Sequence, residues 1–184
     1  KGETGSLSLD TLTVLLLDRS ENLWVGTDGA GLNLKSPHRG AFLHYGEGQP
    51  PPLRIDILSV RALLYDRERT LWVSGYDGLE RYREGVRVYR SDQPFYSLLQ
   101  QREPPYTFWL GSEGQGLFTL KIGEERPRPY RPRKGRLKGA LIYSLLQGRD
   151  GLLWVGTNQG LNRLNMTTGE VKSVPLPRGE ESAV

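Results

Sequence analysis

The chain has 184 residues, no cysteine and a net charge of +4 at pH 7. This length can bury a sizeable core, and the lack of cysteine excludes disulfides, thiolate catalysis and cysteine-ligated zinc. No apolar run approaches the roughly 20 residues that a transmembrane helix needs. The chain shows no signal peptide and begins at Lys1 rather than methionine, so we expect a processed product or a part of a longer protein.

The first 45 residues predict four short strands. Leu12–Leu17 is an apolar run closed by a polar turn, and Leu23–Val25 is a second run with strong strand preference. After a glycine-rich turn, Leu32–Leu34 alternates apolar and polar side chains, as a strand with one buried face should. Ala41–Tyr45 is a fourth candidate strand. Short runs joined by tight turns predict an antiparallel meander.

The same pattern occurs four times in the sequence. The hairpin of the first copy has the sequence NLWVGTDGAGL, and the three later copies have TLWVSGYDGL, FWLGSEGQGL and LLWVGTNQGL. The four tryptophans occupy the same place in the four copies: Trp24, Trp72, Trp109 and Trp154. We expect repeats at about residues 7–45, 57–90, 95–131 and 141–174. A period of about 40–50 residues indicates a solenoid, a propeller or an array.

A four-stranded meander of this size cannot bury its own faces. Packed face to face around an axis, such sheets bury a continuous core, so the repeats predict an all-β fold of β-propeller blades. A flat solenoid of sheets fits less well, because β-solenoid periods are much shorter. Four blades of a larger ring would leave two open apolar faces. We therefore expect part of a larger propeller or association with a second copy, unless the chain closes as a four-blade ring.

The repeated tryptophans could form a platform on which sugars stack, but packing between neighbouring blades is the stronger interpretation. We expect all four indoles to be mostly buried at equivalent positions. The glycines that follow them, Gly26, Gly111 and Gly156, are expected to permit close packing or a special backbone angle.

The pattern resembles the two-component regulator propeller repeat. The stretches LLLDRSENLWVGTDGAGLNL and LLQGRDGLLWVGTNQGLNRL carry the resemblance, through an apolar strand, a turn with Asp and Arg, Leu-Trp-Val-Gly-Thr and Gly-Leu. The second copy departs from it at Ser74-Gly75, and the third departs at Ser112 and through a Pro-Pro insertion. The resemblance extends from about Leu7 to Val174.

This resemblance implies a ligand-sensing or interaction segment of a bacterial membrane-bound signal-transduction receptor, placed in the periplasm or otherwise outside the cytoplasm. Family members pass a signal to a histidine kinase, a diguanylate cyclase or a similar output domain, and some sense oligosaccharides. They usually carry many more than four blades, so further blades are expected partners. Because one fold hosts many functions, a protein-interaction scaffold and a streptogramin-lyase-like propeller enzyme stay open as alternatives.

The loops between the second and third strands are candidate ligand-binding elements, because they gather on one face of a propeller. Their polar side chains differ between copies, as binding specificity requires. The candidate residues are Asp28, Tyr76, Asp77, Glu113, Gln115, Asn158 and Gln159. The alternative is that Asp and Asn are simply good turn formers.

A basic segment, RPRPYRPRKGRLK, lies between the third and fourth copies. Its seven cations are Arg126, Arg128, Arg131, Arg133, Lys134, Arg136 and Lys138, and without them the net charge would change from +4 to −3. The segment could be a solvated outer strand and linker, or it could bind an anionic glycan, a membrane surface or nucleic acid. Nucleic acid fits least, because only Tyr130 could stack on a base.

Catalysis has little support in the sequence. The two histidines, His38 and His44, lie in one copy, and neither a Ser/His/Asp set nor a metal-spaced cluster is evident. We expect no enzyme activity, no cofactor and no metal. A lyase would need a histidine beside a carboxylate on the loop face.

Overall fold

The computed structural model describes residues 5–175, which form four antiparallel sheets of four strands each, in chain order. Blade 1 holds β1 (Leu12–Leu17), β2 (Leu23–Thr27), β3 (Leu32–Lys35) and β4 (Leu43–Tyr45). Blade 2 holds β5 (Val60–Tyr65), β6 (Leu71–Gly75), β7 (Gly78–Arg83) and β8 (Val86–Ser91). Blade 3 holds β9 (Phe95–Gln100), β10 (Phe108–Ser112), β11 (Leu117–Leu120) and β12 (Arg128–Pro129). Blade 4 holds β13 (Ile142–Gln147), β14 (Leu152–Thr157), β15 (Gly160–Asn165) and β16 (Val171–Ser173).

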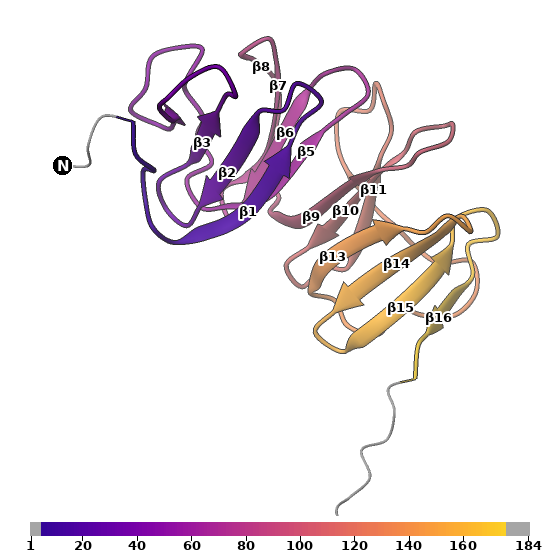
Figure 1. The fold of residues 1–184 in the computed structure, drawn as a ribbon. Coiled ribbons are helices and arrows are strands. Elements are labelled where there is room, and N and C mark those ends of the chain that lie inside the picture. The colour runs from indigo at the N-terminus through magenta and orange to yellow at the C-terminus, as the bar shows by residue number, and fades with distance from the viewer. Residues whose placement is uncertain (1–4, 176–184) are drawn as a thin grey trace, which may run out of the picture.

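The blades follow one another along an open arc, with blade 1 at one end and blade 4 at the other (Figure 1). Their first strands contact each other in sequence, β1 with β5, β5 with β9 and β9 with β13, and so form the inner edge of the arc. This arrangement confirms the predicted all-β propeller blades. Within residues 5–175 we find no helix of the kind that could span a membrane.

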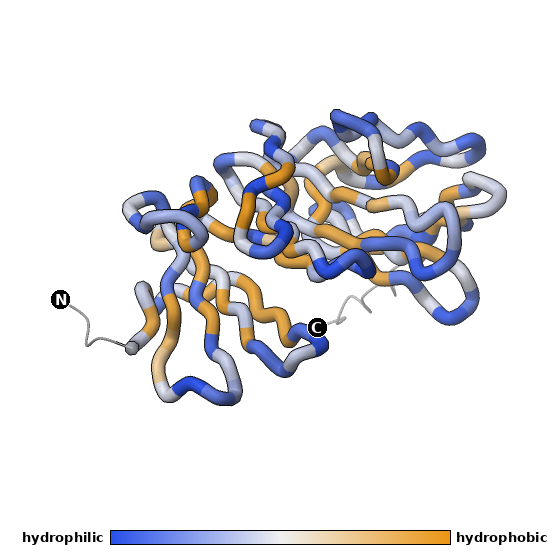
Figure 2. The backbone as a smooth tube through the Cα atoms, turned by 90° about the horizontal axis from the view of Figure 1, so that it is seen from above, coloured by the Kyte–Doolittle hydropathy of each residue, from blue (hydrophilic) through white to orange (hydrophobic). Residues whose placement is uncertain are grey.

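An apolar core fills each space between consecutive blades. Each core joins the tryptophan and the Gly-Leu leucine of one blade to the facing side of the next blade. Figure 2 shows the hydrophobic stretches running along the strands and the hydrophilic ones at the turns. Trp24, Trp72 and Trp109 are buried in these cores, whereas Trp154 is only partly buried. Trp154 has the equivalent register position in blade 4 but is less buried than the other three indoles, because no described blade follows it.

Glycine at the end of the second strand lets the next blade approach. A Cβ on Gly26 would lie 2.8 Å from the Val60 side chain of blade 2, and one on Gly111 would lie 2.5 Å from Ile142 of blade 4. These distances are shorter than carbon atoms tolerate. At Gly156, by contrast, the atoms within reach belong to Ser144 of the same blade. The close-packing expectation thus describes the two glycines that have a neighbouring blade.

Two aspartates explain the recurring turn between the first and second strands. The Trp24 indole Nε1 donates a 2.9 Å hydrogen bond to Asp18, and Trp72 Nε1 donates a 2.7 Å bond to Asp66. Each carboxylate also accepts backbone N–H groups of its own turn. Partial burial of Asp18 opposes its ionisation, but the bonds from Trp24 and the turn outweigh that effect and hold its pKa below the ordinary value.

A buried polar side chain in the third strand holds the segment that enters the blade. Asn33 accepts from Ser8 N at 3.1 Å, and Asn162 accepts from Lys138 N at 3.0 Å. Glu80, at the equivalent position of blade 2, accepts from a backbone N–H at 3.2 Å and from two arginines. Blade 3 departs from this pattern, because Phe118 occupies the position and packs edge-on against Phe95.

Both ends of the arc carry exposed aliphatic side chains. On blade 1, Leu15 is 63% exposed, although its counterpart Leu63 in blade 2 is 8% exposed. On blade 4, Leu146 is 63% exposed and Leu161 is 37% exposed, whereas the counterpart Leu79 is fully buried. These faces have the composition of the three internal interfaces but have no described partner.

Candidate functional site

A β-bulge recurs near the start of every inner strand, and it organises the loop face. The pairing with the second strand skips one residue in each blade. The skipped residues are Thr13, Arg61, Tyr96 and Tyr143. A bulge re-aims the extra side chain and is common beside functional sites. Here it brings strand residues to the same end of the blades as the loops between second and third strands.

Asp28 and Arg61 link blades 1 and 2 at this face. Arg61 Nη2 lies 3.1 Å from both carboxylate oxygens of Asp28, and the Ser59 hydroxyl donates to the same carboxylate. The Ser59 hydrogen bond, together with the positive charge of Arg61, holds the pKa of Asp28 below its ordinary value. Arg61 also donates to the Tyr76 hydroxyl at 3.1 Å, and its guanidinium lies 4.6 Å from the Tyr76 ring centroid.

The contacts continue from blade 2 into blade 3. The rings of Tyr76 and Tyr96 meet edge to face, with centroids 5.5 Å apart. Burial, the Glu113 carboxylate and the Tyr76 hydroxyl all raise the pKa of Tyr96 above its ordinary value. Asp28, Arg61, Tyr76, Tyr96 and Glu113 therefore form one polar path across three blades.

Tyr143 extends this surface to blade 4. Its side chain is 56% exposed at the bulge of β13. Glu113 forms a β-bridge with Leu141, two residues before Tyr143, just as Asp28 forms one with Ser59, two residues before Arg61. We call the surface made by the polar path and Tyr143 the bulge face. It combines carboxylates, a guanidinium and phenol hydroxyls with the exposed aromatic rings of Tyr76 and Tyr143.

The structure brings together three of the predicted loop residues, Asp28, Tyr76 and Glu113. Asp77 instead accepts from Leu58 N at 3.0 Å, and Gln115 accepts from Gln93 Nε2 at 3.3 Å. The remaining two, Asn158 and Gln159, are exposed in the turn between β14 and β15. Sequence reasoning missed Arg61, Tyr96 and Tyr143, which lie on strands rather than loops. Aligning the second residue of each inner strand could have found them.

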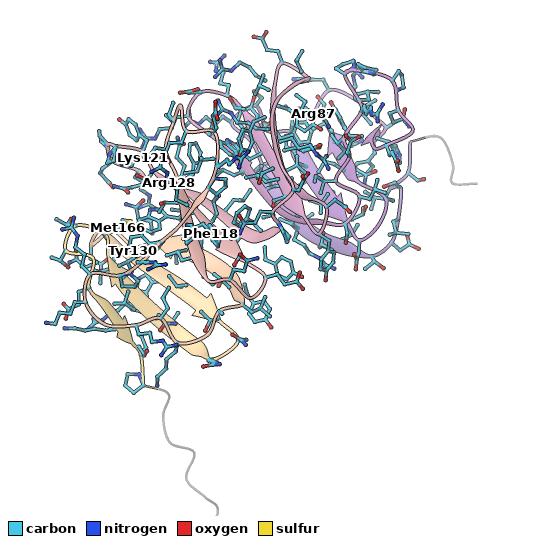
Figure 3. The ribbon with its side chains drawn as sticks, turned by 180° about the vertical axis from the view of Figure 1, so that it is seen from behind. Arg87, Phe118, Lys121, Arg128, Tyr130 and Met166 are labelled. Atoms are coloured by element: carbon cyan, nitrogen blue, oxygen red, sulfur yellow. The ribbon has the colours of Figure 1, made fainter. Side chains whose placement is uncertain are left out.

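The basic segment lies on the outer edge of blades 3 and 4, in β12 and the connection that follows (Figure 3). Its seven predicted cations are all exposed. Arg128 pairs with Glu124 at 3.5 Å, and Lys134 pairs with Glu170 at 3.3 Å. Among residues 5–175, the other five cations make no ion pair: Arg126, Arg131, Arg133, Arg136 and Lys138.

Tyr130 does not serve this segment as a stacking group. Its ring lies 4.9 Å from the Trp109 ring, centroid to centroid, and belongs to the core between blades 3 and 4.

The histidines lie on blade 1, away from the bulge face. His44 is in β4 and its Nε2 donates to the Ser6 carbonyl oxygen at 2.8 Å, while His38 is exposed in a turn. Over the described residues no cluster of three or more metal-binding side chains occurs.

The family model of the two component regulator propeller matches residues 136–159. These residues span the connection into blade 4 together with β13 and β14. The match is confined to this one repeat, and it agrees with the resemblance that the repeated Leu-Trp-Val-Gly-Thr motif carries. No curated protein matches the sequence.

Solved structures match this chain over nearly its whole length. Extracellular domains of two hybrid two component systems from B. thetaiotaomicron match with TM-scores of 0.75 and 0.75, at 21% and 17% identity. They cover 96% and 94% of this chain, and 23% and 24% of their own. An ancestral GH74 enzyme matches with a TM-score of 0.70 at 12% identity, covering 91% of this chain and 24% of its own.

The chain spans about a quarter of the length of these solved structures. The β-propeller domain of Cps50 (Swd1) from Myceliophteria thermophila also matches, with a TM-score of 0.66 at 14% identity, covering 89% of this chain and 56% of its own, and this match confirms the β-propeller fold. At such low identity a shared fold does not carry a shared activity.

Proposed function

We propose that this chain is a ligand-sensing propeller segment of a bacterial membrane-bound receptor, outside the cytoplasm, and that its ligand binds at the bulge face. One observation carries the proposal: the repeated bulge sets Arg61, Tyr96 and Tyr143 beside the loop acids. Recognition surfaces are built in this way, from variable side chains on a regular scaffold. The extracellular domains with the same fold support the location.

The chemistry of the bulge face suits an oligosaccharide. Sugar hydroxyls need donors and acceptors matched in number and direction, and the Asp28 and Glu113 carboxylates, the Arg61 guanidinium and the tyrosine hydroxyls supply both. The open ring of Tyr143 adds an apolar surface against which a sugar ring can stack. The two carboxylates disfavour an anionic glycan at this face. A neutral or basic glycan is therefore the proposed ligand.

A glycan-array screen followed by calorimetry on the hits at two salt concentrations tests this proposal. We expect binding that is insensitive to salt, and we expect Tyr143→Ala to weaken it by about tenfold, equivalent to about 1.4 kcal/mol. Neutralising Arg131, Arg133 and Lys134 together is the matched control and should leave the affinity unchanged. Binding that survives Tyr143→Ala and vanishes in the control variant would place the site on the basic segment instead.

The open faces support a second part of the proposal, that further blades complete the ring. A blade packed on blade 4 would cover Leu146, Trp154 and Leu161, as blade 3 covers the equivalent residues of blade 2. The blades would come from a longer chain or from a second copy. A kinase or cyclase output domain in the full-length chain would then receive the signal, through a change in the conformational equilibrium.

The unpaired cations of the basic segment favour one other candidate function, an interaction scaffold for an acidic partner protein. Five exposed cations without ion pairs can attract such a surface and set its association rate. This attraction would weaken steeply with salt, whereas oligosaccharide binding at the bulge face would not. Surface plasmon resonance with an acidic peptide at low and physiological salt separates the two functions.

A further inference from the structure

A cavity of about 130 Å³ lies between blades 1 and 2, at the end of the strands opposite the bulge face. Trp24 and Leu32 of blade 1 form one wall, and Leu71 and Tyr82 of blade 2 form the other. Ile55, in the connection between the blades, also lines it. All five side chains are buried. Apart from Tyr82, they make no polar contact inside the core except the hydrogen bond from the Trp24 indole to Asp18. The interior is therefore apolar and partly aromatic.

The next interface shows which group this space accommodates. Phe108 of blade 3 occupies the position that Leu71 occupies in blade 2, at the start of the second strand. Its ring lies 4.4 Å from the Trp72 ring, centroid to centroid, and is almost completely buried. Between blades 1 and 2, Leu71 leaves the equivalent side of Trp24 without an aromatic ring. The cavity thus lies where the interface between blades 2 and 3 holds a phenyl group, whereas the interface between blades 3 and 4 has Leu153 at this position.

Polar groups surround the opening of the cavity. Tyr45 and Tyr65 line it and are half-buried, and Arg69 and Glu84 line it and are exposed. Arg69 and Glu84 both have positive φ values, 60° and 50°, at the tips of their turns. Within residues 5–175 neither has an ion-pair or hydrogen-bond partner through its side chain. The opening therefore offers one free cation and one free anion beside two phenol groups.

We propose that this cavity binds a molecule with a single aromatic ring, whose polar substituent faces Arg69 and Glu84. The size agrees, because an apolar cavity of roughly 150 Å³ holds one benzene molecule. The ring would pack against Trp24 as Phe108 packs against Trp72. The substituent would stay at the opening, where charged and phenolic groups can satisfy it. This site is separate from the bulge face and independent of the function proposed there.

Filling the cavity from within tests the proposal. Phenol and benzoate serve as probes, with affinities measured by NMR titration of the intact chain. We expect both to bind, and Leu71→Phe to weaken both by at least about tenfold, or about 1.4 kcal/mol, because the new phenyl group occupies the space. Arg69→Gln should weaken benzoate by about threefold and spare phenol, because an exposed ion pair contributes little.

Two controls keep the outcome decisive. Tyr143→Ala, on the bulge face, should leave phenol binding unchanged, so failure of this site and failure of the proposed function can be told apart. If Leu71→Phe does not fold, a crystal soaked with 4-iodophenol gives a direct answer through the anomalous signal of iodine between blades 1 and 2. No binding of either probe, binding that persists in a folded Leu71→Phe variant, or iodine found elsewhere would overturn the proposal.

Discussion

The interface between blades 2 and 3 and the open face of blade 4 present the same repeat in two different surroundings. Trp72 is 1% exposed because Phe108 and the rest of blade 3 cover it. Trp154 occupies the same register position and is only partly buried. The leucines behave in the same way, since Leu79 is fully buried and Leu161 is exposed.

This difference shows that the repeat specifies which side chains face a neighbour, whereas the neighbour decides whether they are buried. The open face keeps the composition of an interface, including the partly covered Trp154 and the glycine beneath it. Large exposed apolar surfaces on soluble proteins usually mark a place where something else binds. Comparing equivalent substitutions at the two surfaces measures what the neighbouring blade contributes.

The largest expected effect comes from removing the two indoles one at a time. Trp72→Ala should lower the free energy of unfolding by about 3–5 kcal/mol, the usual range for a fully buried tryptophan. Trp154→Ala should lower the free energy of unfolding by about 1–2 kcal/mol, because folding removes less apolar area of Trp154 from water. Urea unfolding followed by circular dichroism gives both values. Equal losses would mean that something covers Trp154 in solution, and light scattering would then reveal association.

A smaller effect, with a pH signature, concerns the carboxylate that holds Trp24. Asp18→Asn keeps the side-chain size but removes the charge of the carboxylate that accepts hydrogen bonds from the indole and the backbone. The free energy of unfolding at pH 7 should therefore fall by about 1 kcal/mol or less. The pKa of Asp18 is lowered in the folded chain, so its contribution is present above the ordinary value of 3.8 and is lost as pH falls through the folded value.

Thermal melts of both proteins from neutral to acid pH measure this contribution. The two melting temperatures should converge as the pH drops below 3.8. Arg19→Gln, in the same turn, is the control and should not change the pH dependence. A gap between Asp18→Asn and the unchanged chain that widens in acid would contradict the assignment of the carboxylate.

The smallest effect is a gain of stability in blade 3. Trp109 Nε1 is buried and has no hydrogen-bond partner in the described part of the chain. Gln101 occupies the turn position of Asp18 and Asp66. In all three turns the backbone N–H of this residue donates to the carbonyl oxygen of the residue before the second strand. Gln101→Asp should supply the missing acceptor and stabilise the chain by about 0.5–1 kcal/mol. Chemical denaturation measures it, and a destabilised variant would refute the equivalence.

Most of the strands could be predicted from the sequence, because each copy repeats apolar runs between turn residues. The structure places β5 and β9 where the second and third copies begin. The short β12 shows the limit of such reasoning, since a proline-rich stretch pairs over only two residues. The buried position shared by Asn33, Glu80 and Asn162 was not predicted either. Polar residues in a strand suggest exposure until the backbone that they bind is known.

The candidate site was predictable as a region but not residue by residue. Tyr76 and Asp77 are neighbours in one loop, yet Tyr76 joins the bulge face and Asp77 turns back to the Leu58 N–H. The sequence does not distinguish the roles of these two residues, because the difference comes from the direction in which each side chain points. Arg61 and Tyr96 were missed since a bulge, which depends on pairing with the second strand, presents a strand residue to the loop face.

The open arc also has a consequence for how the chain unfolds. Blades 2 and 3 each pack against two neighbours, while blades 1 and 4 each pack against one. In such a linear array every blade is stabilised by its own strands and by the blades beside it, so fraying should start at the ends and move inward. Amide hydrogen exchange should accordingly be fastest in the outer strands of blades 1 and 4 and slowest in β6 and β10.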